Sequence, residues 1–387
     1  MVMFTMRRPL SILLFAVLPC AARAAISAAG GYWTNSATWD TGVPAPGADV
    51  TITGGHSVTS DVSPAGLNSL TIVGTLVCAG WSTVVTASTV TVNGTVTHPP
   101  QSAVATNASG QWVPDNRVWI VCGNLTVAAG KAINTSLRGY LGGTNSTMNG
   151  AGPAGGATGS NPSGGNYGSA GGGRFPAAYG SALSPGDPGS GGGSDNGAYL
   201  GGNGGGVVRI DASGQVTVDG TITADGGTVT RGGAGSGGSV LIQCQTIAGT
   251  GSVTAAGGRN TSGYGGAGGG GGRVAVAYAP AAQAAAGDVC RVVFNVRSGW
   301  GADGGSLEGL PGTLHLSDSQ FFPYTNASGN YGLCTLGATS AWQRSSLFMT
   351  NGYVWITGLG EGMVTNAIAI RGYATTKAAQ EQPVVLR

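Results

Sequence analysis

Short runs in which apolar and polar residues alternate recur along most of the chain. VTVNGTVT (Val90 to Thr97) and VTVDGTIT (Val216 to Thr223) each place an apolar residue at every second position, with a small polar turn in the middle. A period of two is typical of β-strands that bury one face. Together with the abundance of valine, threonine, isoleucine and glycine, the pattern predicts an all-β protein with many turns.

The two runs belong to a longer internal repeat. They differ at only two positions, and looser copies begin at Asn124 and Ile247. Near the middle of the chain the period is 31 residues, which takes Gly220 to Gly251. Each unit reads as strand, short gap, strand, small-residue turn, strand and glycine-rich excursion. Tandem units of this kind are the signature of a repeat architecture.

Two architectures fit these units. Asn-Gly or Asp-Gly between alternating strands is a strong hairpin signal and would give antiparallel meanders. Tandem units with strands in matching places also describe a β-solenoid, in which each unit is one coil stacked on the last. We favour the β-solenoid because the flanking sequences recur together with the turn, and the hairpin alternative stays open.

The glycine-rich excursions adjoin the strands directly. In GGAGGGGGRVAVAY (Gly265 to Tyr278), glycine allows positive φ and close backbone approach, so we expect the glycines between coils and RVAVAY as the next wall. Residues 139–206 contain almost no Leu, Ile or Val and cannot form a conventional core. They are either a flexible loop or extended glycine segments packed on one face of the solenoid. Four aromatic residues could pin the packed form: Tyr167, Phe175, Tyr179 and Tyr199.

The N-terminus carries an export signal. MVMFTMRRPLSILLFAVLPCAARA has an arginine pair, a short apolar run and an A-x-A site, which predicts cleavage after Ala24 and a secreted or cell-surface protein. No membrane span is expected in the mature chain. The expected organisation is a signal peptide (1–24), an N-terminal cap with the first coils (25–138), a glycine-rich insertion (139–206), glycine-rich repeats (207–280) and a C-terminal β-rich segment (281–387).

Composition and charge argue against some classes of binding partner. Only 8% of residues are charged, the net charge is +2, and the Lys and Arg residues are scattered, so neither nucleic acid nor an anionic membrane is expected as a partner. Five cysteines follow the cleavage site without a C-x-x-C pair. They either form one or two disulfides in an oxidising compartment or are small buried hydrophobes, the alternative we favour. The five are Cys78, Cys122, Cys244, Cys290 and Cys334.

Candidate catalytic chemistry is sparse. Asp211, Asp219 and Asp225 are the only close acidic group in the repeats, and a polysaccharide-cleaving site would need them to converge with Arg209 or Arg231. Asp219 occupies a turn position, which indicates a structural role. No nucleophile motif accompanies the three histidines, which are His56, His98 and His315. The sequence therefore predicts no catalytic, cofactor-binding or metal-binding residue, and no cofactor.

Two further residue classes suggest surface or end roles. Trp33 and Trp39 lie just before the turn GVPAPG, and we expect them to cap the first coil. Threonines at alternate positions suggest an ice-binding or other surface-binding solenoid, or simply favourable outward strand residues. These threonines are Thr89, Thr91, Thr95, Thr97, Thr217, Thr221 and Thr223.

Several stretches resemble known proteins. GYWTNSATWDTGVPAPGADVTITGGHSVTSD is similar to the opening of large bacterial secreted β-helix proteins, and GGVVRIDASGQVTVDGTITADGG and GGGGGRVAVAY resemble glycine-rich repeats of bacterial adhesins and autotransporter-like surface proteins. The resemblance implies a right-handed parallel β-helix and a surface or matrix role. We expect an exported, non-enzymatic structural or adhesive protein whose partners are extracellular polysaccharide or cell-surface components. Self-association stays open, and a polysaccharide lyase or hydrolase is the rival hypothesis.

Overall fold

The computed structural model describes most of the chain. The described residues are 23–101, 105–173, 177–262, 265–287, 290–301, 307–318, 320–321 and, for their backbone alone, the strands at 332–336, 342–350, 354–357 and 362–371. Of the expected signal peptide only residues 23 and 24 are among them.

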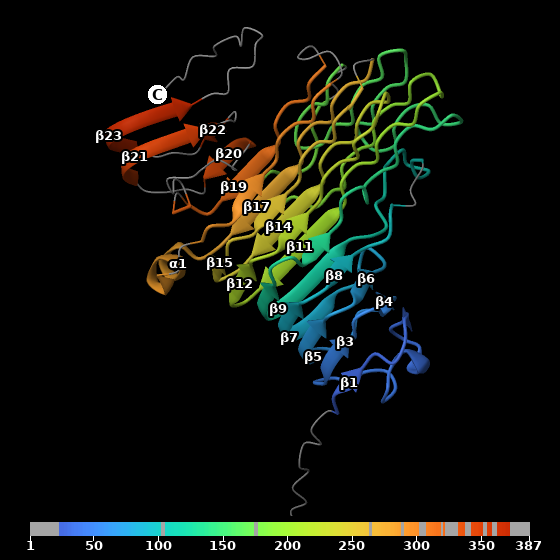
Figure 1. Ribbon diagram of the computed structural model, residues 1–387, viewed down its shortest axis with the longest axis vertical. Coiled ribbons are helices and arrows are strands. Elements are labelled where there is room, and N and C mark those ends of the chain that lie inside the picture. The colour runs from blue at the N-terminus through green and yellow to red at the C-terminus, as the bar shows by residue number, and fades with distance from the viewer. Residues whose placement is uncertain are drawn as a thin grey trace, which may run out of the picture.

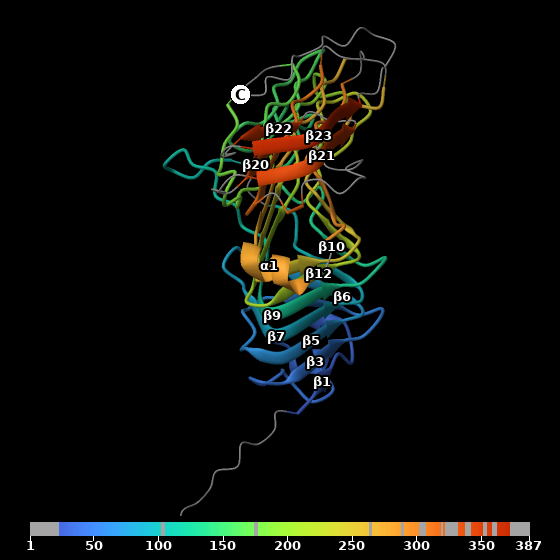
Figure 2. The same ribbon diagram turned by 90° about the vertical axis from the view of Figure 1, so that its left-hand side faces the viewer.

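The protein is a parallel β-helix built around two long sheets. Sheet A has thirteen strands, and its backbone order follows the chain (Figure 1). The strands of sheet A are β1 (Ala25–Ile26), β3 (Asp49–Ile52), β5 (Leu67–Ile72), β7 (Val85–Val92), β9 (Val118–Val127), β11 (Val207–Ala212), β12 (Gln215–Val218), β14 (Ser239–Gln243), β15 (Thr246–Ala248), β17 (Arg273–Ala277), β19 (Thr313–Leu316), β20 (Gly332–Leu336) and β22 (Val354–Thr357). Viewed from the side, β1 to β9 lie one above another like rungs (Figure 2).

Sheet B has eight strands and faces sheet A across the core. Its strands are β2 (Gly31–Tyr32), β4 (Ser57–Ser60), β6 (Thr75–Cys78), β8 (Thr95–Thr97), β10 (Ala132–Asn134), β13 (Thr221–Thr223), β16 (Ser252–Thr254) and β18 (Val293–Asn295). A separate parallel pair is formed by β21 (Trp342–Thr350) and β23 (Gly362–Arg371). All strand pairs within sheets A and B are parallel, so the solenoid prediction is confirmed and the hairpin alternative is wrong.

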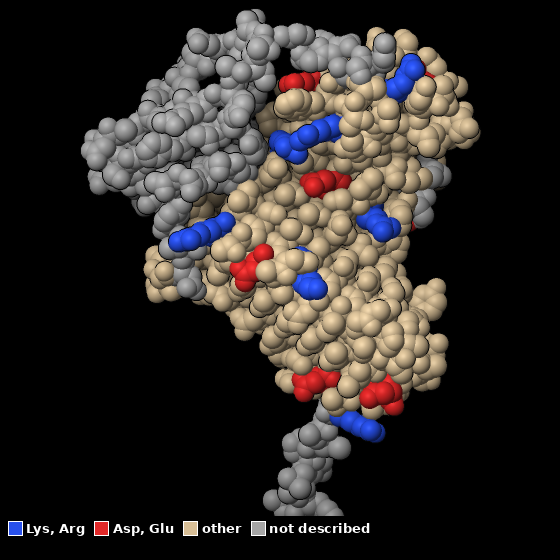
Figure 3. Space-filling view, in the orientation of Figure 1, with Lys and Arg blue, Asp and Glu red and all other residues tan. Residues whose placement is uncertain are grey.

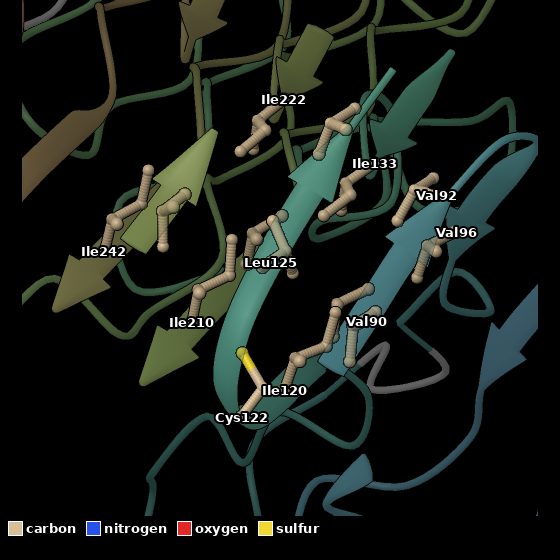
Figure 4. Close-up of a cluster of buried hydrophobic side chains, with 14 of the residues drawn as sticks. Val90, Val92, Val96, Ile120, Cys122, Leu125, Ile133, Ile210, Ile222 and Ile242 are labelled. Carbon is tan, nitrogen blue, oxygen red and sulfur yellow. The ribbon is translucent and has the colours of Figure 1, made fainter. Parts of the chain in front are cut away.

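The core is one continuous column of aliphatic side chains between the sheets. Val90 of β7 lies opposite Leu125 of β9, and Leu125 lies opposite Val216 of β12, so like residues stack from coil to coil. Figure 4 shows Val90 and Leu125 of sheet A together with Ile133 and Ile222 of sheet B in the buried cluster, to which Val216 also belongs. All five are fully buried, and each buried aliphatic side chain contributes about 1.5–3 kcal/mol by leaving water.

The turn glycines explain why the sequence imitates hairpins. Gly94 and Gly220 follow Asn93 and Asp219, yet neither has the positive φ of a hairpin turn. A Cβ on Gly94 would lie 2.1 Å from the carbonyl oxygen of Gly74 in the previous coil. Glycine is therefore required at this position because the coils approach closely, and the Asn-Gly signal reports stacking rather than a reversal.

The glycine-rich excursions all occur at one place in the coil. Each leaves a sheet B strand (β10, β13, β16 or β18) and returns to the next sheet A strand (β11, β14, β17 or β19). Because successive coils stack, the excursions also lie together, and they form the upper right part of the molecule in Figure 1. We call this region the glycine bundle; it comprises residues 139–206, 226–238, 257–272 and 299–312, as far as these are described.

Backbone hydrogen bonds in the glycine bundle repeat every third residue. The N–H groups of Gly189 and Gly192 donate to the oxygens of Gly205 and Gly202, whereas Gly191, between them, donates to another segment. A repeat of three residues is that of the extended polyproline-II helix, which has no internal hydrogen bonds. The segments therefore satisfy their polar groups by bonding to several neighbours, which is how a stretch without aliphatic side chains can be buried.

Glycine is the only residue that this packing admits at many positions. A Cβ on Gly192 would lie 2.0 Å from the oxygen of Gly233, and one on Gly204 would lie 1.9 Å from that of Gly189. The described residues of the insertion at 139–206 thus form a packed layer. The alternative of extended glycine segments fits them, because their backbone groups bond to neighbouring segments.

A buried polar cluster fixes the glycine bundle to sheet A. Tyr167 is fully buried, its hydroxyl lies 2.6 Å from Ser239 Oγ of β14, and its ring packs on Tyr179. Arg273 of β17 donates to the carbonyl oxygen of Tyr179 at 2.8 Å and 3.0 Å. Tyr167 and Tyr179 pin the insertion as expected, whereas Tyr199 lies exposed. Phe175 lies outside the described residues.

The two ends of the stack differ. At the N-terminal end the 3-10 helix η1 (Ser36–Thr38) adjoins Trp33 and Trp39, both buried, whose rings lie 4.8 Å apart. This placement is the expected one for a cap. At the other end α1 (Pro280–Ala286) follows β17, and sheet A continues through β19, β20 and β22, beyond the repeats that are visible in the sequence.

Candidate ligand-binding surface

Outward-facing threonines form a column across sheet A. Five neighbouring strands each contribute one threonine, and each threonine pairs directly with the threonine of the next strand. The threonine column consists of Thr51, Thr71, Thr91, Thr126 and Thr217. Neighbouring strands lie about 4.8 Å apart, so the column is a regular rank of hydroxyl and methyl groups. Of the threonines expected from the sequence, Thr91 and Thr217 belong to it.

A shallow groove lies on the outer face of sheet B. Its volume is about 590 Å³, and hydroxyl groups line much of it. The lining residues are Thr75, Thr95, Thr97, Asn134, Ser136, Leu137 and Arg138. Leu137 is half exposed and has a φ of 60°, a backbone conformation that costs free energy for a leucine. The groove offers a mixed polar and apolar surface with a single cation, Arg138.

Cations and indole rings gather on the outer face of sheet A, in what we call the Trp–Arg cluster. It consists of Trp81, Arg117, Trp119, Arg209 and Asp211. The Arg117 guanidinium lies 4.6 Å from the Trp81 ring centre and 4.1 Å from that of Trp119, and the Arg209 guanidinium lies 4.6 Å from Trp119. Asp211 accepts from Arg209 Nε and from Trp119 Nε1, both at 2.8 Å. Strand pairing brings Arg209 of β11 directly beside Trp119 of β9.

The cluster stands out against a surface of low charge. Figure 3 shows a face on which the charged side chains are few and mostly separate. Within the cluster, Arg117 and Arg209 face one carboxylate. Burial, and after it the charge of Arg209, lower the pKa of Arg117 below its usual range. The sequence singles out Arg209 and Asp211 as members of a possible converging site, but it does not place Arg117, Trp81 or Trp119 beside them, because these residues are far apart in the chain.

The three candidate carboxylates have different partners. Asp211 belongs to the Trp–Arg cluster. Asp219 lies at the turn after β12 and accepts from the backbone N–H of Thr250 at 3.1 Å, as turn chemistry predicts. Asp225 accepts from the backbone N–H of Ala256 at 2.7 Å, and burial raises its pKa. Each of the last two links neighbouring coils, and no contact among the described residues joins the three carboxylates into one groove.

The histidines take structural positions where the structure describes them. His98 is fully buried; its Nε2 lies 3.2 Å from the Val207 nitrogen and its Nδ1 lies 2.6 Å from the Pro99 oxygen. His56 Nδ1 lies 2.9 Å from Ser27 Oγ, a serine–histidine contact that no sequence motif signals. Ser27 is 3% exposed, and its Oγ also accepts from a backbone N–H, so an external substrate has little access to it.

The cysteines that can be placed are free. Cys78, Cys122 and Cys290 are buried as predicted, whereas Cys244 is half buried. Burial raises the pKa of Cys78, Cys122 and Cys244 to about 12. The side chain of Cys334 is outside the description. In the described part of the chain, no three metal-binding side chains gather at one point, and no helix there is long and apolar enough to cross a membrane.

Comparison with known proteins gives one partial match. Residues 35–104 match the G8 domain. In this chain the G8 segment comprises η1 and the strands from β3 to β8, which are the first coils of the β-helix. It contains Trp81 of the Trp–Arg cluster, whereas Arg117, Trp119, Arg209 and Asp211 lie outside it. No curated protein and no solved structure matches the chain.

Proposed function

We propose that the chain is an exported, non-enzymatic protein of the cell surface or extracellular matrix that binds extracellular polysaccharide along the outer faces of its β-helix. The observation that carries the proposal is the outer surface of sheet A, where the threonine column and the Trp–Arg cluster lie on one face. Stacked coils present such groups over a long surface, and solenoids typically bind ligands along extended faces. Hydroxyl groups and aromatic rings are suited to polyhydroxylated ligands.

Two further features support it. Among the described residues the first strand begins at Ala25, the residue that follows the expected cleavage site. Asp219 and Asp225 bond between coils, so among the described residues the three candidate carboxylates do not form the converging pair that glycoside hydrolysis needs.

The test is a glycan array run beside a polysaccharide-degradation screen on the protein that begins at Ala25. We expect binding without turnover. Turnover that Asp211→Ala abolishes would establish the rival lyase or hydrolase function. Silence in both assays would refute binding and leave a purely structural role.

A second candidate is binding to ice or another regular solid surface, and the threonine column favours it. Thermal hysteresis of the protein solution measures this activity directly. If it occurs and is lost in Thr91→Lys, the column binds ice. If there is none, the ice-binding candidate is refuted.

A further inference from the structure

Arg117 is held in an unusual way. Its guanidinium lies over the rings of both Trp81 and Trp119, and its buried Nε donates to no described residue. Guanidinium groups carry five N–H donors in one plane. Where a face of the guanidinium packs on an indole, the edges of its plane remain as the direction from which an acceptor approaches.

The local charge is unbalanced. Arg117 and Arg209 lie over the same indole, and Asp211 compensates only one of the two cations. Asp211 is itself engaged through Oδ2, which accepts from both Arg209 and Trp119, while its Oδ1 is buried and bonds to no described residue. Two partly buried like charges repel each other, and an anion between them would remove that repulsion.

We propose that the Trp–Arg cluster is an anion-binding site and that its ligand is a carboxylate group on an acidic polysaccharide. This inference rests on the proposed function and names the ligand class of that surface. A carboxylate is planar and accepts two parallel N–H bonds, so it fits in the plane of a guanidinium whose face packs on indole rings. Exposed Thr89 and Asn124, further along the outer face of β7 and β9, supply uncharged groups for sugar hydroxyls.

The ligand side of the test uses three polymers. Polygalacturonate supplies carboxylates, its methyl ester is the uncharged match, and dextran sulfate supplies a tetrahedral anion. Binding is measured by affinity electrophoresis over a series of salt concentrations. We expect polygalacturonate to bind most tightly and its affinity to fall as salt rises, because the contact is ionic.

The protein side uses matched arginine variants. Arg117→Gln should weaken polygalacturonate binding by roughly tenfold or more, the loss expected for one charge-assisted pair, and should leave the weak methyl-ester binding unchanged. Arg117→Lys keeps the charge but loses the planar fork, so we expect an intermediate affinity. Arg259→Gln is the control, because Arg259 also lies over an indole, that of Trp300, but in the glycine bundle.

The outcomes separate this inference from the proposed function. If the native protein binds polygalacturonate and its ester equally and Arg117→Gln changes neither, polysaccharide binding stands and the anion site is refuted. If none of the three polymers binds, both fail. Equal or tighter binding of dextran sulfate would overturn the preference for carboxylate. If Arg117→Gln fails to fold, the folded Arg117→Lys variant decides, and its unchanged affinity would refute the site.

Discussion

At the residue scale, many glycines of this protein are required because the neighbouring backbone leaves no room for a side chain. Most glycines of the glycine bundle have no positive φ, yet a Cβ on them would overlap backbone atoms of neighbouring segments. Gly192 and Gly186 differ sharply in this respect. Around Gly192 a Cβ would lie 2.0 Å from a carbonyl oxygen, whereas around Gly186 nothing lies within 4 Å.

We therefore predict that Gly192→Ala destabilises the protein by about 3 kcal/mol or more, because the neighbouring backbone cannot yield without breaking hydrogen bonds. Gly186→Ala should change the free energy of unfolding by less than about 1 kcal/mol, since only the unfolded chain is affected. Urea unfolding of both variants checks this. Equal effects would mean that the segment around Gly192 is packed more loosely than the contacts indicate.

His98 should make the stability of the folded protein depend on pH. Burial lowers its pKa from 6.5 to about 4 in the folded protein. Between these values the unfolded chain takes up a proton that the folded protein does not, so stability falls as pH decreases from about 7 to 4. The loss should reach about 3 kcal/mol relative to a variant without this group. Urea unfolding of the wild type and His98→Gln at pH 7, 5.5 and 4 measures the difference. Parallel pH curves would contradict it.

At the element scale, the sequence predicts where strands lie but not which segments lie beside them. Period-two alternation marked the strand-containing stretches Val90 to Thr97 and Val216 to Thr223, and the recurrence of flanking residues indicated stacking. The coil at β9 that lies between them was visible only as a loose copy. The glycine bundle has no hydrophobic period at all, because its segments recognise one another through backbone groups. The Trp–Arg cluster was hidden because its members are far apart in the chain, and only the pairing of β11 with β9 brings Arg209 beside Trp119.

Helix α1 covers the edge of β15 that is not paired with β12. β15 pairs with β12 on one side, and on the other the Gln283 side chain bonds to the backbone of Ile247, accepting at 2.7 Å and donating at 3.0 Å. We predict that Gln283→Met speeds hydrogen exchange at the Ile247 amide and costs about 1–3 kcal/mol, because two buried backbone groups lose their partner. The control, Gln111→Met, alters an exposed side chain. An unchanged exchange rate at Ile247 would show that this edge is protected by other means.

At the scale of the whole molecule, the stack has two differently supported halves. Coils up to β8 are held mainly by their neighbours in sheets A and B, whereas coils from β9 onward are also tied to the glycine bundle. In a solenoid each coil contacts only adjacent coils, so stability can vary along the axis. The G8 segment falls in the half without the bundle.

Two cysteines, one in each half, allow the stability of the two halves to be compared. Cys78 of β6 and Cys122 of β9 are both buried, and both have a pKa raised to about 12 from 9.0. Their thiolate fractions at pH 8 are therefore about a thousandfold lower than in the unfolded chain, and labelling of either thiol requires local opening of the fold.

In proteins that retain only one of the two, with alanine at the other cysteines, we predict that Cys78 becomes reactive at a lower urea concentration than Cys122. Because their pKa values match, the difference would measure local opening rather than thiol acidity. Identical urea midpoints would show that the β-helix and the glycine bundle unfold as one unit, and earlier labelling of Cys122 would show that the bundle does not stabilise the coils beside it.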